Sequence, residues 1–229
     1  MLYYYDPTYI LVLIGVALSL WASANVNSAI AKYRKVQSMS GQTAAGVARK
    51  ILQENGIYNV TVKQISQGAS DYYNPATKEV CLLAANYNSN SIASIGIAAH
   101  ECGHAIQDAT EYLPLAIQRH LAPICALGSQ AGFYVVLAGL LFGMDQVVNL
   151  GIVLFTMGVF ITVLLLPIEF DASSRALKIL EGRQILSGEE LKGARKVLTA
   201  AGLTYVAAAA ASILSLLRLL LIARSNRRD

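Results

Sequence analysis

Residues 100–104, His-Glu-Cys-Gly-His, form an HExxH motif and carry the clearest potential for chemistry in the sequence. On a helix, positions i and i+4 share a face, so the imidazoles of His100 and His104 can bind one metal ion. Glu101 lies beside them and can hold a water bound to that ion. The plain alternative is a pair of histidines exposed on a helix. Zinc is the metal favoured by this pattern, because its catalytic sites combine such ligands with one open position.

A catalytic zinc ion usually has three protein ligands, so one more is needed besides the two histidines. A metzincin would place a histidine six residues after His104, but that position is Thr110. His120 is a candidate, although it lies at the edge of an apolar segment and can equally be an interfacial side chain. Asp108 is another candidate, whose plainer role is a solvated carboxylate or a partner of a ligand.

Glu169 and Asp171 are stronger candidates because they directly follow the uncharged residues 146–168. A carboxylate at a membrane boundary is costly unless it is paired or binds a cation. Asp171 can form an i to i+4 ion pair with Arg175. Glu169 has no cation at i+3 or i+4, so a metal ion is its best partner.

The composition indicates a membrane protein. Of 229 residues, 55% are hydrophobic and only 14% are charged, whereas soluble domains carry about 25% charged residues. No Asp, Glu, Lys or Arg occurs in four windows, 7–31, 121–144, 146–168 and 197–217. Each window can cross a bilayer, for which about 20 apolar residues suffice. This argues against a soluble enzyme, a disordered regulator and a small disulfide-stapled domain.

The distribution of cations predicts the topology. The first window is expected to remain as a helix rather than be cleaved as a signal peptide, because Asp6 is the only charge before it. Of the 18 Lys and Arg, eight lie in residues 32–119 and six in 175–196. Four crossings put both segments on one side, which the positive-inside rule assigns to the cytoplasm. The basic residues after 217 would then lie outside. The net charge of +4 reflects these flanking cations, and no nucleic-acid partner is predicted.

Short patterns place the HExxH motif in a small α+β segment. Thr43 or Ser40 can cap a helix that Gly56 ends, and residues 58–65 alternate as in a strand. After a turn at residues 74–75, a second strand is predicted at Glu79, Val80, Cys81, Leu82 and Leu83, with an open edge for an extended substrate. A helix from about 91 to 107 carries the motif.

The remaining patterns concern the later helices and the cysteines. Asp145 alone separates two windows, which predicts a tight helical hairpin. Pro167 is expected to end the third span and start a short helix ended by Gly182. Ser187 and Glu190 form a capping box for the helix leading into the fourth window. The three cysteines lack CxxC spacing and are predicted to be buried thiols.

Several segments resemble the YugP-type bacterial membrane zinc metallopeptidases, which share the HExxH logic of gluzincins. They are SDYYNPATKEVCL, SIASIGIAAHECGHAIQ, LPIEFDASSRAL and ELKGARKVLTAAGLTYVAAA. The resemblance implies one Zn²⁺ bound by His100, His104 and Glu169, with Glu101 as catalytic base. The loop that we associate with Asp-His-Tyr in the family here reads Asp-Tyr-Tyr at residues 71–73, so it offers no imidazole. Related HtpX and CAAX-processing peptidases place an Asp four residues after the Glu, where this chain has Ser173.

The expected fold is a mainly α, polytopic membrane protein with about four transmembrane helices and a small cytoplasmic α+β zincin-like domain. We divide the chain into an N-terminal transmembrane helix (1–31), a zincin-like segment (32–120), a transmembrane hairpin (121–168), cytoplasmic helices with the third ligand (169–196), and a C-terminal transmembrane helix with a basic tail (197–229).

The predicted function is that of a zinc metalloendopeptidase at the cytoplasmic face of the bacterial inner membrane, acting on membrane-associated or unfolded polypeptides. Asp171, Tyr72, Tyr73 and Arg175 are candidates for supporting the ligands or the oxyanion. A non-proteolytic zinc hydrolase and a site-2-like intramembrane protease are the alternatives. The sequence does not indicate an oligomeric state.

Overall fold

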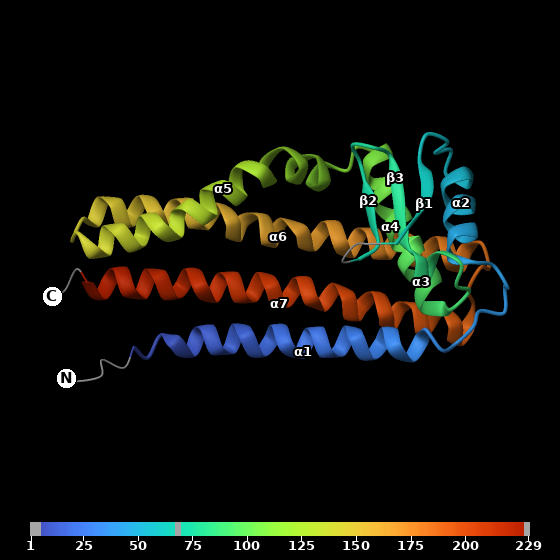
Figure 1. Cartoon of the computed structure of the whole chain (residues 1–229), viewed down its shortest axis with the longest axis horizontal. Helices are drawn as coiled ribbons and strands as arrows, with labels where there is room; N and C mark the ends of the chain where they lie inside the picture. Colours follow the sequence, from blue (N-terminus) through green and yellow to red (C-terminus); the bar gives the residue numbers. More distant parts are fainter. Residues whose placement is uncertain (1–5, 67–69, 227–229) are drawn as a thin grey trace. The chain divides into compact units, whose positions relative to one another are not determined.

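The computed structural model describes residues 6–66 and 70–226, and most of them are helical (Figure 1). The helices are α1 (Tyr9–Tyr33), α2 (Ala44–Glu54), α3 (Ala84–Tyr87), α4 (Ile92–Ala109), α5 (Leu113–Leu141), α6 (Asp145–Gly182) and α7 (Gly188–Asn226). The strands are β1 (Thr61–Ile65), β2 (Tyr72–Asn74) and β3 (Glu79–Leu83). This confirms the expected mainly α class with a small sheet.

The chain forms two compact units. The site unit contains residues Ala24–Ala116 and Pro167–Leu203. The helical unit contains the described parts of Met1–Ser23, Ile117–Leu166 and Thr204–Asp229. Four helices, α1, α5, α6 and α7, contribute residues to both units, α5 only by its first turn.

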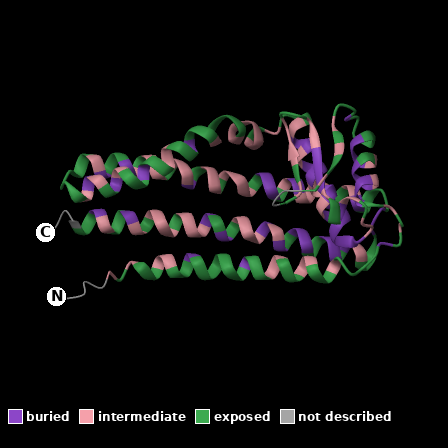
Figure 2. Cartoon of the chain, viewed as in Figure 1, coloured by how far each residue is buried: buried purple, intermediate pink, exposed green. Residues whose placement is uncertain are grey.

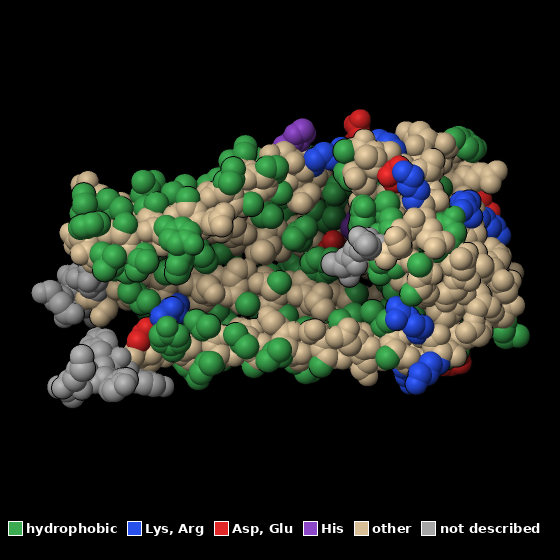
Figure 3. Space-filling model, viewed as in Figure 1, with side chains coloured by type: hydrophobic (Ala, Val, Ile, Leu, Met, Phe, Trp, Pro, Cys, Tyr) green, Lys and Arg blue, Asp and Glu red, His purple; other side chains and the backbone are tan. Residues whose placement is uncertain are grey.

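Four helices, α1, α5, α6 and α7, are long and apolar enough to cross a membrane. Only 11–22% of their most apolar windows is buried. Figure 2 shows many exposed residues along these helices, and Figure 3 shows hydrophobic side chains on their surface. Trp21, Leu127 and Leu150 are among these exposed side chains. Apolar surface of this extent is what contact with lipid requires.

The α5–α6 hairpin is packed at glycines, as expected for membrane helices. A Cβ on Gly139 would lie 2.6 Å from the Val148 nitrogen, and one on Gly151 would lie 2.5 Å from the Val136 nitrogen. Larger residues there would separate the two backbones. The predicted tight hairpin is therefore present.

The core of the site unit is built from α2, α4, β3 and the adjoining parts of α6 and α7 (Figure 2). Thr43 caps α2 by accepting a hydrogen bond from the Gly46 amide at 3.2 Å. Gly56, with φ of +72°, follows the end of α2, a conformation that favours glycine. Both sequence predictions for this helix are confirmed. The apolar side of α2 then packs against α4.

The sheet order corrects the expected open edge. The order is β1-β3-β2, so β3 is the central strand. β1 pairs with it in parallel and β2 in antiparallel orientation. Beyond the end of β2, the amide of Leu83 donates to Asp71 Oδ1 at 2.7 Å. The prediction that residues 79–83 present an open edge is wrong, because strand order is set by contacts that no local pattern reveals.

Helix α6 and residues 72–74 differ from expectation, and Glu190 has a partner that was not predicted. Helix α6 continues through Pro167, so this proline neither ends the span nor starts a new helix. The helix beyond this proline packs closely against α4, at Gly103 and Ala172. Residues 72–74, predicted as part of a loop, form β2. The Glu190 carboxylate accepts a hydrogen bond from the Met39 amide at 2.7 Å, a partner that the capping-box prediction did not include.

Candidate metal centre

The site forms where α4 crosses α6 at close range. A Cβ on Gly103 would lie only 2.5 Å from the Ala172 carbonyl oxygen, so glycine is required for this approach. Gly103 is one of the two variable positions of the HExxH motif. The crossing brings the histidines of α4 beside Glu169 on α6.

His100, His104 and Glu169 form the one group of potential metal ligands found in the described residues, with ligand atoms within 4.8 Å of one another. Glu169 Oε2 lies 3.2 Å from His100 Nε2 and 3.6 Å from His104 Nε2. Ligand atoms of a tetrahedral zinc ion, each about 2.0–2.2 Å from the metal, lie about 3.3–3.6 Å apart. The observed spacing therefore fits a zinc ion.

The burial of Glu169 Oε2 also fits a role in binding a cation. This oxygen is buried and has no hydrogen-bond partner among the described residues. A buried carboxylate oxygen without a partner is unfavourable. A metal ion at the site would satisfy it, so the donor set and the burial agree.

The second ring nitrogen of each histidine, Nδ1, also has a polar partner. Ser173 Oγ lies 3.1 Å from His100 Nδ1, and Gln107 Oε1 lies 3.0 Å from His104 Nδ1. These contacts leave the Nε2 atoms turned toward Glu169. A metal-binding histidine commonly has such a partner, which orients the ring.

Hydrogen bonds to Gln107 define the tautomer of His104. Gln107 is fully buried, and its Nε2 donates to the Ile168 carbonyl at 2.7 Å and to Asp171 Oδ2 at 2.9 Å. Because both partners are acceptors, the amide oxygen must face His104. Nδ1 of His104 then carries the proton, and its Nε2 is free to bind a metal.

Asp171 and Arg175 support this arrangement from outside. Arg175 Nε donates to Asp171 Oδ2 at 2.6 Å, which confirms the ion pair expected at i to i+4. The guanidinium of Arg175 lies 5.7 Å from the ring of Tyr112. Asp171 thus reaches His104 through Gln107, whereas Ser173 contacts His100 directly.

Glu101 is buried, with 8% of its surface exposed. Burial raises its pKa above the usual value, against the opposing effect of His100 and His104. Burial disfavours a charged imidazole at His104, but Glu169 and Glu101 outweigh this and raise the pKa of His104 to about 9. Metal binding to His104 therefore competes with protonation of its imidazole.

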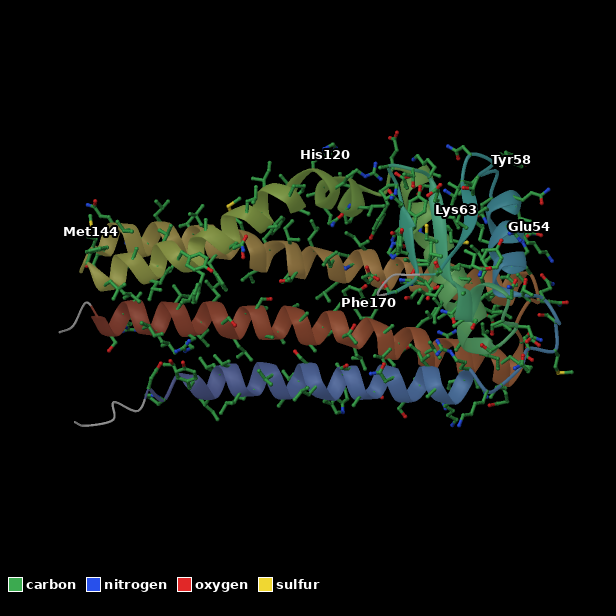
Figure 4. All side chains as sticks on the ribbon, in the orientation of Figure 1. Glu54, Tyr58, Lys63, His120, Met144 and Phe170 are labelled. Atoms are coloured by element: carbon green, nitrogen blue, oxygen red, sulfur yellow. The ribbon has the colours of Figure 1, made fainter. Side chains whose placement is uncertain are left out.

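Other candidates have different partners. Asp108 forms an ion pair with Lys78 at 2.5 Å and accepts a hydrogen bond from the Tyr73 hydroxyl at 2.6 Å. Tyr72 is exposed on β2 opposite Cys81. His120 is exposed on α5 (Figure 4). Among the described residues, neither Asp108 nor His120 belongs to a potential metal-binding group.

The sequence reasoning missed three residues that organise the site. Gln107 lies at i+3 from His104, a helical spacing that could have indicated it. The sequence points to Ser173 only by its position four residues after Glu169, and its contact with His100 Nδ1 is given by the structure alone. Asp71 accepts hydrogen bonds from the Leu83 amide and from Asn86 Nδ2 at 2.6 Å, and so anchors the segment before β2. No local pattern indicates this last role.

The fold and the site define a class: a protein with four helices suited to span a membrane, in which an HExxH helix and a glutamate from a later helix could together hold a metal ion. The chain belongs to the family described as "Putative neutral zinc metallopeptidase", which matches residues 8–224. It is 39% identical over 219 residues to "Putative membrane protease YugP" of Bacillus subtilis (strain 168), covering 96% of this chain and 97% of that protein. No solved structure matches. The predicted family and zinc cofactor are thereby confirmed.

Proposed function

We propose that this membrane zinc metallopeptidase is an endopeptidase in which His100, His104 and Glu169 hold the zinc ion and Glu101 is the general base. The observation that carries the proposal is the tetrahedral spacing of Glu169 Oε2 to the two histidine Nε2 atoms. Glu101 lies on the same helix, between the two histidines in sequence.

Zinc bound there would polarise a peptide carbonyl and lower the pKa of the attacking water. The Glu101 carboxylate accepts a proton from that water and later donates it to the leaving amine. Burial raises the pKa of Glu101 toward the working pH, which favours this exchange. Gln107 and Ser173 keep the two imidazoles oriented throughout.

An extended substrate would need a free strand edge, and we place it at β2 rather than β3. Among the described residues, the outer side of β2 pairs with no strand. β2 also lies near α4, because the Tyr73 hydroxyl donates a hydrogen bond to the Asp108 carboxylate of α4. We further propose that the substrates are membrane-associated or unfolded polypeptides. We also propose that the site faces the cytoplasm at the bacterial inner membrane, and we keep the five-part division of the chain given above as a proposal.

Purified protein in detergent tests the proposal through Glu101→Gln. The variant should retain zinc but cleave casein about 10²-fold more slowly or worse, because only the base is removed. Glu111→Gln, an exposed glutamate beyond the end of α4, is the control and should cleave normally. Chelator should abolish cleavage by the unmodified protein.

The same assay separates the alternatives. Undiminished cleavage by Glu101→Gln would contradict the role of this residue. Hydrolysis of esters without cleavage of any peptide would favour the non-proteolytic hydrolase. A site-2-like intramembrane protease is disfavoured because α4 is not one of the four helices suited to span a membrane.

A further inference from the structure

A cavity lined by both polar and apolar side chains lies in the site unit, between α1 and α7. Its volume is about 420 Å³. Tyr33 forms part of the wall and packs against α7 where Gly193 leaves room, since a Cβ there would lie 2.7 Å from the tyrosine ring. The polar side chains that line the cavity are Asn25, Ser28, Lys32, Arg195, Lys196 and Thr199.

The charges around this cavity are of one sign. Lys32, Arg195 and Lys196 line it, and no carboxylate does. Some other cations of the chain have acidic partners, as Lys63 does with Glu79. Within residues 6–66 and 70–226, the three cations of the cavity have no such ion pair. Figure 3 shows Lys and Arg side chains gathered at these ends of α1 and α7. The cavity is therefore suited to an anion.

The cavity also lies at one end of the uncharged stretch of each helix. The uncharged residues of α1 end just before Lys32, and those of α7 begin just after Lys196. Helices α1 and α7 are antiparallel here. Lys32, near the end of α1, therefore lies by the same cavity as Arg195 and Lys196, near the start of α7. Further along α7 the lining becomes apolar, at Ala200 and Leu203. Polarity therefore falls from a cationic end to an apolar end.

We propose that this cavity binds the phosphate headgroup of an anionic membrane lipid. Lys32, Arg195 and Lys196 contact the phosphate, the Ser28 and Thr199 hydroxyls and the Asn25 amide face the glycerol region, and the acyl chains follow the apolar surfaces of α1 and α7. Free inorganic phosphate shares the charge but not the acyl chains. The apolar wall at Leu203 therefore favours the lipid as the source. This binding does not depend on peptidase activity.

The full-length protein, purified in a neutral detergent with equal phosphatidylglycerol and phosphatidylcholine, provides the test. Native mass spectrometry measures the lipid retained per chain. The unmodified protein should retain phosphatidylglycerol preferentially. The double variant Lys32→Gln/Lys196→Gln should bind it about 25-fold more weakly, at about fivefold for each cation lost near the membrane surface.

The matched control is Lys35→Gln/Lys50→Gln, which removes the same charge from cations outside the cavity. It should retain phosphatidylglycerol as the unmodified protein does. Equal losses in the two double variants, or no preference for phosphatidylglycerol in the unmodified protein, would overturn the proposal. Displacement of the lipid by inorganic phosphate at equal concentration would overturn the lipid as the ligand. Normal casein cleavage by the cavity variant would show that its peptidase site is intact.

Discussion

At the scale of the residue, Glu169 and Asp171 lie two positions apart on α6 and contact different groups. Glu169 faces the Nε2 atoms of both histidines, and one of its oxygens is buried without a hydrogen bond. Asp171 accepts from Arg175 and Gln107. Their geometry therefore predicts a larger loss of zinc affinity when Glu169 is replaced than when Asp171 is replaced.

Glu169→Ala should lose zinc affinity by more than the 10 to 100-fold typical of residues that only support a ligand, because two imidazoles and no protein anion remain. Asp171→Ala should stay within that range, since Gln107 keeps its bond to the Ile168 carbonyl. Zinc per chain after dialysis against a weak chelator measures both. Retention of zinc by Glu169→Ala, with loss in Asp171→Ala, would reverse the assignment.

Gln107→Leu should lower zinc affinity by about 10 to 100-fold, because His104 Nδ1 loses its acceptor and the Ile168 carbonyl and Asp171 lose a donor. Competition with a chromophoric chelator gives the affinity. Gln53→Leu, at an exposed position of α2, is the matched control and should bind zinc normally. Identical affinities for the two variants would show that Gln107 does not orient the ligand.

At the scale of the element, the close crossing of α4 and α6 brings the HExxH motif beside Glu169. Two glycines of α4 differ sharply in their surroundings. Gly103 meets the backbone of Ala172, which cannot move aside as a side chain can. A Cβ on Gly96 would lie 3.5 Å from the Ala194 side chain, an ordinary van der Waals contact.

Gly103→Ala should therefore destabilise the protein by about 1–3 kcal/mol, the range for overpacking, and weaken zinc binding by separating Glu169 from the histidines. Gly96→Ala should be neutral or stabilising, because alanine favours a helix by up to about 1 kcal/mol over glycine. Thermal unfolding in detergent and zinc content report on both. A lower melting temperature for Gly96→Ala than for Gly103→Ala would contradict this packing argument.

At the scale of the whole molecule, the chain combines four helices suited to span a membrane with a unit that contains the candidate metal site. Helices α1, α6 and α7 each contribute to both units, so the site is built partly on the same helices that are suited to span the membrane. The side of the membrane on which the site lies is predicted from the cations in residues 32–119 and 175–196.

Cysteines introduced at Gln42 and Asn149 should report this orientation. Gln42 lies before α2 in the site unit, and Asn149 is near the start of α6 in the helical unit. In intact cells, a membrane-impermeant thiol reagent should label the cysteine at 149 and leave that at 42 unlabelled until the cells are opened. The reverse pattern would place the site outside the cytoplasm. The native cysteines are buried free thiols, so background labelling should be low.

The sequence by itself determined those features that depend on neighbours along the chain. The spacing of His100 and His104, the uncharged windows and the Thr43 cap are local, because helical periodicity and apolar length act within a few turns. Glu169 could also be singled out, since an acidic residue without a cation at i+3 or i+4 after an apolar span needs a distant partner.

Only the tertiary structure decided which distant groups meet. The central position of β3, the continuity of α6 through Pro167, and the contacts of Gln107 with Ile168 and of Ser173 with His100 join segments far apart in the chain. Each depends on the summed packing of many side chains, and no single residue pattern encodes that sum. The candidate ligands could therefore be proposed from the sequence, whereas the residues that contact and orient them required the fold.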